Sequence, residues 1–505
     1  MNNGSKKKLT LMALTLMTVT SVYGFNNIPI SFYLMGYGAI PWYILSAVTF
    51  FLPYVFMIAE FGAAFKDEKG GMYIWMGKSV NYKYAFIVTF MWYASWIVWM
   101  TEICASIFVN ISNIIFGTDK TQYLHLFGLN STQIIGLLAM LLIILFTYGA
   151  SKGLTWVSKA ASVGGASILA ISVIFVLGSI VTWIANGGRL LQPITSLGSF
   201  VTSPNPSYLS AVSVLGFVVF ALFAYGGAEA LGGVVDQTEN AEKTFPKSMV
   251  LSAITIAVLY SLGIFAVGIF TNWSRYLSPD SVNMVNVRYL IMNVFGYQLA
   301  LSLGASKSLA IIIGDWSARI IALSVFLSLV GAFFTLIYAP LRLLIEGTPA
   351  ELWPGKIAEP NDKGVPVYAM WIQCLVVFVI LFLISFGGTA AKTFYARLVL
   401  MMNVASTLPY VFLCLAYPFF KSNKNIKKPF VIFKSRTSVI IATTVTVLTL
   451  LVANFFTIIQ PALSGDIESS LWMVAGPIFF SVVAWLLFRR YENRKPMITE
   501  EKEIE

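Results

Sequence analysis

Apolar and polar positions alternate along the chain in long blocks. Twelve mainly apolar runs have the length needed to cross a bilayer as helices, which takes roughly 17 to 25 residues. Short polar connections separate these runs and hold nearly all the charged residues. The pattern predicts an all-α integral membrane protein with twelve transmembrane helices, at residues 9–37, 40–64, 84–110, 132–150, 160–185, 208–235, 248–271, 316–341, 367–387, 395–419, 437–460 and 470–488.

Composition supports this class. The 505 residues are 58% hydrophobic and 11% charged, too apolar for a soluble globular protein. No soluble domain or long linker interrupts the pattern, so residues 1–505 form one polytopic unit. The outer connection 271–315 contains an apolar stretch, predicted to be a short helix over the outer mouth. The predicted parts are helices 1–6 in 9–235, helices 7–10 in 248–419, helices 11–12 in 437–488 and a charged tail in 489–505.

The basic residues set the predicted orientation. A formal charge of +11 is compatible with nucleic-acid binding, but the Lys and Arg residues are scattered through alternate loops and form no single stripe. Placing both termini in the cytoplasm puts 25 of the 33 Lys and Arg on the inner side, as the positive-inside rule requires. The sequence therefore predicts a multi-pass protein with cytoplasmic termini, with lipid and not nucleic acid around it.

The first apolar run is interrupted between Ser21 and Pro29. Gly24 permits backbone conformations that other residues avoid, and Pro29 suits the first turn of a new helix. Backbone groups that bulk water does not reach need a polar partner, so a gap here predicts a bound solute. The helix after the gap presents amides and partial positive charge that fit a carboxylate. The alternative is a plain kink in a structural helix.

The sixth run contains a second interruption, with glycine pairs around a carboxylate. Gly226-Gly227 and Gly232-Gly233 flank Glu229 in an otherwise apolar span. An ionisable side chain in hydrocarbon is costly without partners, so it is a functional candidate. Phe223 and Tyr225 stand beside the break, where they either cover a bound solute or serve only in packing.

Breaks in the first and sixth helices indicate two five-helix halves of opposite orientation. An odd number of helices per repeat inverts the second copy and brings both gaps together near the middle of the membrane. Spans eleven and twelve lie outside this repeat. The prediction depends on the positions of the interruptions alone.

Five stretches of the chain resemble a known transporter family. They are residues 220–230 with 238–246 around the sixth helix, 69–75 after the second, and 340–354 with 364–366 after the eighth. Together they are similar to the amino acid–polyamine–organocation superfamily, and the branch resembled is the glutamate:GABA antiporter-like group of bacterial amino-acid transporters. The resemblance implies a LeuT-type fold, alternating access, a bacterial inner-membrane location and a central amino-acid site.

The resemblance also implies roles for individual residues. The substrate carboxylate is expected at Tyr23, Gly24 and Phe25, and its amino group at the carbonyls around Ala224, Gly226 and Gly227. Phe223 and Tyr225 are the gating candidates. Some proton-coupled members carry a lysine in the fifth helix, but residues 164–174 contain no basic residue, and Ile168 occupies the equivalent position. This departure weakens a lysine-based proton mechanism.

Two carboxylates lie within predicted spans and are the proton-coupling candidates. Glu229 is one, and Glu102 in the third span is the other. The resemblance places Glu102 beside the substrate, where it would pair with a cationic group. The alternative is a neutral glutamic acid packed between helices, because burial favours the protonated carboxyl.

Other charged groups have structural interpretations. Glu60 is expected to stabilise the inner gate or to meet Lys66, and Asp315 and Arg319 are spaced for an i,i+4 pair. Cys104, Cys374 and Cys414 fall inside spans, and His125 falls in an outer loop. The sequence therefore predicts no metal site, cofactor or catalytic constellation.

The preferred function is a secondary transporter of amino acids or derived amines that works as an exchanger, with Glu102 matching the amine. Proton-coupled uptake through Glu102 or Glu229 is the alternative. A non-transporting amino-acid sensor or a membrane enzyme is the third hypothesis, and the lack of a soluble output domain argues against it. The sequence leaves the oligomeric state open.

Overall fold

The computed structural model describes residues 8–284, 286–362 and 364–504, with residues 495–504 described by their backbone alone. The described chain is helical, and its only bridges between extended residues are two isolated ones. A helix satisfies every backbone group within one segment, as a lipid environment requires. The long continuous helices are α6 (Tyr82–Phe116), α7 (Ser131–Ser151), α8 (Leu154–Ala185), α10 (Ala241–Phe270), α13 (Lys307–Ile345), α14 (Val367–Phe386), α17 (Arg436–Leu463) and α18 (Ile467–Ile504).

Four spans are interrupted. The first consists of α1 (Leu11–Val22) and α2 (Asn27–Met35), and the sixth of α9 (Ala211–Phe223) and the 3₁₀ segment η6 (Ala228–Gln237). The second consists of α3 (Ala39–Ser46), a π-helical turn η2 (Ala47–Phe51) and α4 (Leu52–Ala64). The tenth, predicted as continuous, is divided into α15 (Gly388–Ala405) and α16 (Leu408–Ser422). Pro53 and Pro409 stand just after the last two interruptions, since proline cannot donate the helical hydrogen bond.

Within the described part of the chain, eleven segments are long and apolar enough to cross a membrane. The first, Leu11–Ala64, has 54 residues, or about 80 Å of helix, which exceeds the roughly 30 Å of one crossing. Two crossings in this segment give the twelve spans predicted, although the count itself stays a prediction. The eighth span begins at Lys307 and not at residue 316. α18 continues as helix through the predicted tail, whose side chains beyond Arg494 lie outside the described residues.

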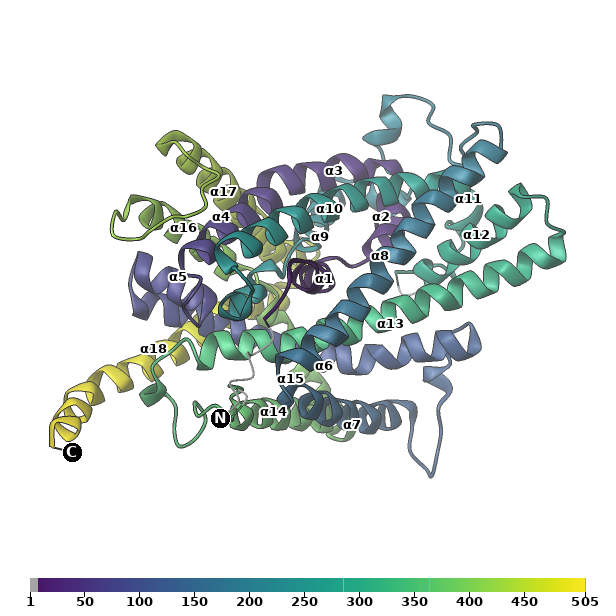
Figure 1. Cartoon of the computed structure of the whole chain (residues 1–505). Helices are drawn as coiled ribbons and strands as arrows, with labels where there is room; N and C mark the ends of the chain where they lie inside the picture. Colours follow the sequence, from purple (N-terminus) through teal and green to yellow (C-terminus); the bar gives the residue numbers. More distant parts are fainter. Residues whose placement is uncertain (1–7, 285, 363, 505) are drawn as a thin grey trace.

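α1 lies in the middle of the bundle, in contact with α8, α10 and α13 (Figure 1). Two short helices lie at opposite ends: α5 (Gly71–Ser79) between spans two and three, and α12 (Val287–Ser302) between spans seven and eight. They hold equivalent places in the two halves of the chain. This placement agrees with the inverted repeat, which stays a prediction, as do the boundaries of its halves.

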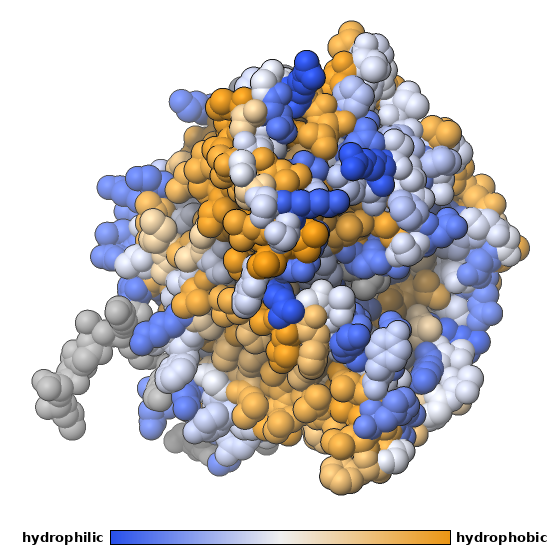
Figure 2. All heavy atoms as spheres, turned by 90° about the vertical axis from the view of Figure 1, so that its right-hand side faces the viewer, coloured by the Kyte–Doolittle hydropathy of each residue, from blue (hydrophilic) through white to orange (hydrophobic). Residues whose placement is uncertain are grey.

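We call the end of the bundle that carries α5 the inner face, because the charge count predicts it to be cytoplasmic. Both described ends of the chain lie there: Leu9 pairs with Thr238 after η6, and Glu492 of α18 forms an ion pair with Lys83 at the start of α6. The view onto the opposite end shows apolar side chains over wide areas between polar ones (Figure 2). Exposed leucines along the spans, such as Leu141 and Leu177, are suited to lipid contact.

Candidate substrate site

The first span is broken at its centre. α1 ends at Val22 and α2 begins at Asn27. The amide of Asn27 donates to the carbonyl of Gly24 at 2.9 Å, which closes a tight turn. Pro29 occupies the first turn of α2, where its missing amide removes no helical bond. The break predicted from Gly24 and Pro29 is confirmed.

The break in the sixth span directly contacts the first. α9 ends at Phe223 and η6 starts at Ala228. Gly227 between them has a φ of +113°, a conformation that favours glycine. A Cβ atom at this position would lie 2.5 Å from the carbonyl oxygen of Ser21. The two breaks therefore meet backbone to backbone, with no room for a side chain.

Tyr260 on α10 joins the two breaks through its hydroxyl group. The hydroxyl accepts hydrogen bonds from the Gly24 amide at 3.0 Å and the Asn27 side-chain amide at 3.2 Å, and donates to the Ala224 carbonyl at 3.1 Å. Its ring contacts Tyr23 at a centroid distance of 5.0 Å. The sequence does not single this residue out, because it is one of 23 tyrosines and its partner Gly24 is 236 residues away.

A cavity of about 540 Å³ lies at the paired breaks, within the usual size range of small-molecule sites. Residues of α6, α8, α13, α16 and α17 complete its wall. Two buried polar atoms of lining residues have no hydrogen-bond partner in the described part of the chain, Asn26 Oδ1 and Trp96 Nε1. Buried polar groups are normally paired, so an acceptor and a donor left open here are suited to a polar ligand.

Six of the predicted residues line this cavity: Tyr23, Gly24, Phe25, Gly226, Gly227 and the gating candidate Phe223. The predicted use of the amides needs correction. The Tyr23 amide donates to the Val19 carbonyl at 2.7 Å, and the Gly24 amide donates to Tyr260. Within the described residues, the amides of Phe25 and Asn26 donate to no acceptor, so they are the ones free to meet a carboxylate.

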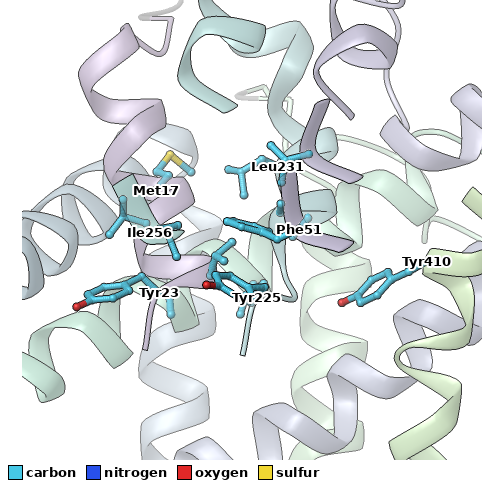
Figure 3. Packing of buried hydrophobic residues seen from close by; sticks show 14 of the residues in the cluster. Met17, Tyr23, Phe51, Tyr225, Leu231, Ile256 and Tyr410 are labelled. Atoms are coloured by element: carbon cyan, nitrogen blue, oxygen red, sulfur yellow. The ribbon is translucent and has the colours of Figure 1, made fainter. Parts of the chain in front are cut away.

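Ala224 and Tyr225 do not line the cavity. The Ala224 carbonyl accepts a hydrogen bond from Tyr260, and its contact with a substrate amino group stays a prediction. Tyr225 is fully buried, stacks on Phe51 at 4.5 Å and donates to the Tyr43 carbonyl at 3.3 Å (Figure 3). It follows the last turn of α9 and points toward α3 and η2, so it packs the core and does not cover the site.

Glu102 also lies outside the cavity, contrary to the predicted contact with substrate. Ser95, Trp96 and Trp99 are the residues of α6 that line it. Glu102 is three residues beyond Trp99, about 4.5 Å farther along the helix, and its side chain is exposed. The sequence gives the helical face of a residue but not how far along the helix the cavity extends.

Glu229 is fully buried behind the cavity wall. Its carboxylate accepts hydrogen bonds from Trp92 Nε1 at 3.0 Å, the Tyr410 hydroxyl at 3.0 Å and the Tyr54 hydroxyl at 3.4 Å. Tyr410 itself lines the cavity and stands between it and Glu229. Three neutral donors, and no cation in the described residues within ion-pair distance, surround this carboxylate.

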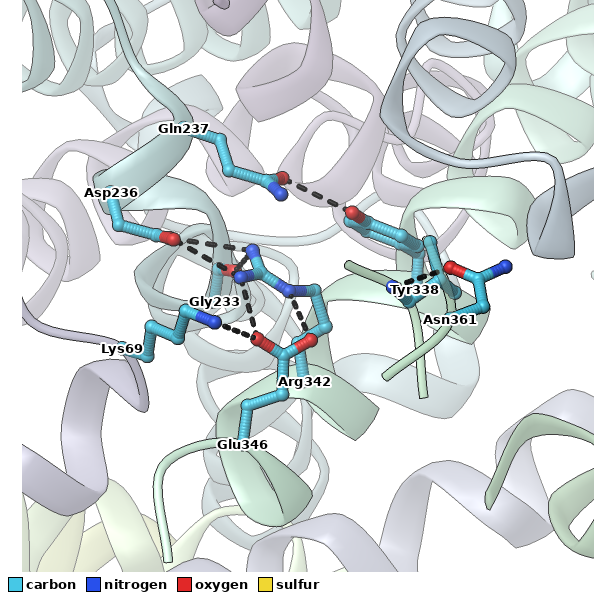
Figure 4. Close-up of polar contacts among 9 residues, drawn as sticks. Lys69, Gly233, Asp236, Gln237, Tyr338, Arg342, Glu346 and Asn361 are labelled. Carbon is cyan, nitrogen blue, oxygen red and sulfur yellow. Dashed lines mark hydrogen bonds and ion pairs between the residues drawn. The ribbon is translucent and has the colours of Figure 1, made fainter. Parts of the chain in front are cut away.

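A charged cluster closes the inner face below η6 (Figure 4). The buried Arg342 of α13 donates to Asp236 at 3.1 and 3.3 Å, to Glu346 at 2.8 Å through two nitrogens, and to the Gly233 carbonyl at 3.0 Å. Lys69, before α5, pairs with Glu346 at 3.1 Å. The cluster holds two positive and two negative groups, so its charges balance while it links three elements.

Other predicted charge pairs are wrong. Glu60 meets Lys421 at 2.7 Å and the amides of the loop before α17, whereas Lys66 pairs with Glu242 at 2.7 Å. Glu60 lies at the inner end of its span, as predicted. Its partner Lys421 is 361 residues away in the chain.

Asp315 and Arg319 do not pair with each other. Asp315 accepts from Asn293 at 2.8 Å, and Arg319 donates to the terminal carbonyls of α6 at Ile114 and Ile115. The carbonyl end of a helix carries partial negative charge, which attracts the guanidinium group.

Replacing Tyr260 with phenylalanine should lower both stability and transport. The substitution leaves the Gly24 amide and the Ala224 carbonyl without their partner, at a cost of about 1 to 3 kcal/mol. Thermal unfolding of the purified protein and uptake into proteoliposomes measure the two effects. Tyr148→Phe on the exposed surface of α7 is the matched control, and equal behaviour of the two variants would contradict the bridging role.

Residues 9–483 match the amino acid permease family. The inner membrane transporter YjeM of Salmonella typhimurium is 48% identical over 97% of both chains. The glutamate/gamma-aminobutyrate antiporter of Lactococcus lactis is 22% identical, over 97% of this chain and 91% of its own. The aspartate/glutamate permease AcaP of Lactococcus lactis is 23% identical, over 83% of this chain and 81% of its own.

These relatives are transporters and not enzymes, in agreement with the all-helical architecture and the membrane spans. The family match covers the helix breaks, the cavity and the inner cluster. The resemblance found in the sequence motifs is thereby confirmed. The chain belongs to the amino acid permease family, a branch of the amino acid–polyamine–organocation superfamily.

Proposed function

We propose that this protein exchanges amino acids across the bacterial inner membrane by alternating access. The observation that carries the proposal is a cavity at two touching helix breaks, with an ion cluster closing the inner side. Discontinuous helices meeting at mid-membrane are the usual substrate sites of secondary transporters. The two described chain ends lie on the inner face with most basic loops, which supports cytoplasmic termini.

The wall of the cavity favours exchange over ion-driven uptake. Ile168 lines the cavity where a lysine would be expected in a lysine-coupled transporter. One relative carries the name of an antiporter, which supports the same mode. For exchange of an amino acid for its amine product, Glu102 is the predicted partner of the amine's positive charge. Because Glu102 lies outside the cavity, the amine has no such partner there. We therefore propose exchange of one amino acid for another.

Counterflow in proteoliposomes tests this proposal. Vesicles loaded with an unlabelled amino acid mixture should take up a labelled amino acid faster than empty vesicles do. Uptake that is indifferent to the internal amino acids would reject exchange. Absence of uptake under either condition would reject transport itself.

Proton-coupled symport is a second candidate, and Glu229 is the observation that favours it. Burial disfavours the charged form of the Glu229 carboxylate and its three donated hydrogen bonds favour that form, so the two protonation states are closer in free energy than burial alone would make them. Its Tyr410 partner connects it to the cavity wall. Substrate and proton binding would then be linked through one hydroxyl group.

Replacing Glu229 with glutamine separates the two modes. If protons are coupled here, pH-gradient-driven accumulation should fall at least about tenfold, because an amide carries no exchangeable charge, while ligand-induced thermal stabilisation persists. Glu102→Gln, on the exposed face of α6, is the control and should keep full accumulation. Undiminished accumulation in Glu229→Gln would remove this residue from any coupling mechanism.

A further inference from the structure

Among the described residues, the central cavity has no charged side chain in its wall. None of the residues that line it is an Asp, Glu, Lys, Arg or His. The polar groups that do face it are hydroxyls, amides and an indole, including those of Asn26, Trp96 and Asn403. A guest must therefore have its own charges matched by neutral dipoles and the broken helix ends alone.

One side of the cavity is mainly apolar. Trp96 and Trp99 of α6 are in edge contact at 5.5 Å, and Trp99 stacks on Phe333 of α13 at 6.4 Å. α13 adds Leu329 and Leu336 to the same wall. This surface offers a substrate side chain dispersion and hydrophobic contact, and its few polar groups, among them the indoles and the Ser328 hydroxyl, are uncharged.

Glu229 and Glu102 do not supply the charge that the cavity wall lacks. Glu229 already accepts three side-chain hydrogen bonds behind Tyr410, and Glu102 lies about 4.5 Å beyond Trp99 along α6, with an exposed side chain outside the cavity. A charged substrate side chain would be buried against apolar groups without a partner, which is strongly unfavourable. The backbone at the breaks, with Asn26 Oδ1 and Trp96 Nε1, has donors and acceptors for an α-carboxylate and an α-ammonium, and the other polar groups of the wall are neutral.

We propose that the substrates are amino acids with uncharged, mainly apolar side chains, which lie against Trp96, Trp99 and the facing residues of α13. The inference rests on the proposed transport function and separates this chain from relatives named for glutamate, aspartate and gamma-aminobutyrate. Glutamate and aspartate have a second carboxylate, and gamma-aminobutyrate has no α-ammonium. The described wall of the cavity has no cation that would pair with a second carboxylate.

Competition for counterflow in proteoliposomes containing the full chain tests the inference. Labelled L-leucine or L-methionine should exchange, and unlabelled L-phenylalanine should compete. L-Glutamate, L-aspartate, L-lysine and gamma-aminobutyrate should compete about a hundredfold less well, as expected when a charge would be left unpaired. Exchange of glutamate or gamma-aminobutyrate at the level of leucine would overturn the substrate class and leave transport intact. Exchange of no amino acid at all would overturn both.

A gain-of-function variant separates charge matching from misfolding. Leu329→Lys places a cation on the apolar wall, so L-glutamate should become a competitor while L-leucine loses at least about tenfold in apparent affinity. Leu329→Met keeps the volume and the neutrality of the wall, so L-glutamate should not become a competitor in this variant. Glutamate competition that stays absent in a folded Leu329→Lys variant would show that charge in this wall does not set the selectivity.

Discussion

Replacing Arg342 with methionine should destabilise the protein and nearly abolish transport. The change leaves Asp236 and Glu346 close together without their shared partner, with only Lys69 to balance them. Removing one member of a buried ion network typically costs about 3 to 5 kcal/mol. Because the cluster links η6, α13 and the segment before α5, its loss should also open the inner face and shift the protein away from the conformation described.

Thermal unfolding in detergent and initial uptake rates measure this prediction. Arg342→Met combined with Glu346→Gln restores the charge balance between Lys69 and Asp236, so it should recover part of the lost stability. Lys83→Met breaks an exposed ion pair with Glu492 and should change stability by about 0.5 kcal/mol or less. A single Arg342→Met variant as stable as Lys83→Met would show that the cluster does not hold the inner face closed.

A feature can be predicted from the sequence when the residues that cause it are close to it in the chain. Gly24, Pro29 and the Gly226-Gly227 pair act on the backbone beside them, so both breaks are located from the sequence. Pro409 marks the break in the tenth span in the same way. The break is not predicted because the apolar run around Pro409 is long enough to be read as one continuous helix. The helix content follows from hydropathy because a bilayer leaves the backbone few alternatives.

Pairings between distant residues are the part that sequence reasoning misses. Tyr260 is identified as the bridge, and Lys421 as the partner of Glu60, only once the helices are packed. Local spacing also favours wrong pairs: Asp315 and Arg319 are correctly spaced on one helix, yet each finds a partner on another element. Energies of competing contacts decide these pairings, and a single sequence does not give them.

Glu102 shows most clearly how far the function can be predicted from the sequence. A carboxylate within a span is a sound candidate in chemical terms. Glu102 could contact the substrate only if the cavity extended to the helical turn that contains it. On α6, however, the cavity ends at Trp99. The substrate class changes as a result, from a guest with an extra cation to one without a charged side chain.

Replacing Gly227 with alanine should abolish uptake. The new Cβ would lie 2.5 Å from the Ser21 carbonyl oxygen, so the two helix breaks must separate. The positive φ of +113° adds roughly 1 to 2 kcal/mol of backbone strain for any residue with a Cβ. Separation would disturb the bridge through Tyr260, since its partners Gly24 and Ala224 belong to different breaks.

Gly304→Ala provides the matched control. Gly304 also has a positive φ, +86°, but a Cβ there meets no atom within 4 Å. It therefore carries the backbone strain without the collision, and we expect a small loss of stability with transport retained. Uptake and ligand-induced thermal stabilisation of the two variants isolate the effect of contact between the breaks. If Gly227→Ala transports as well as Gly304→Ala, close approach of the two breaks is not required for transport.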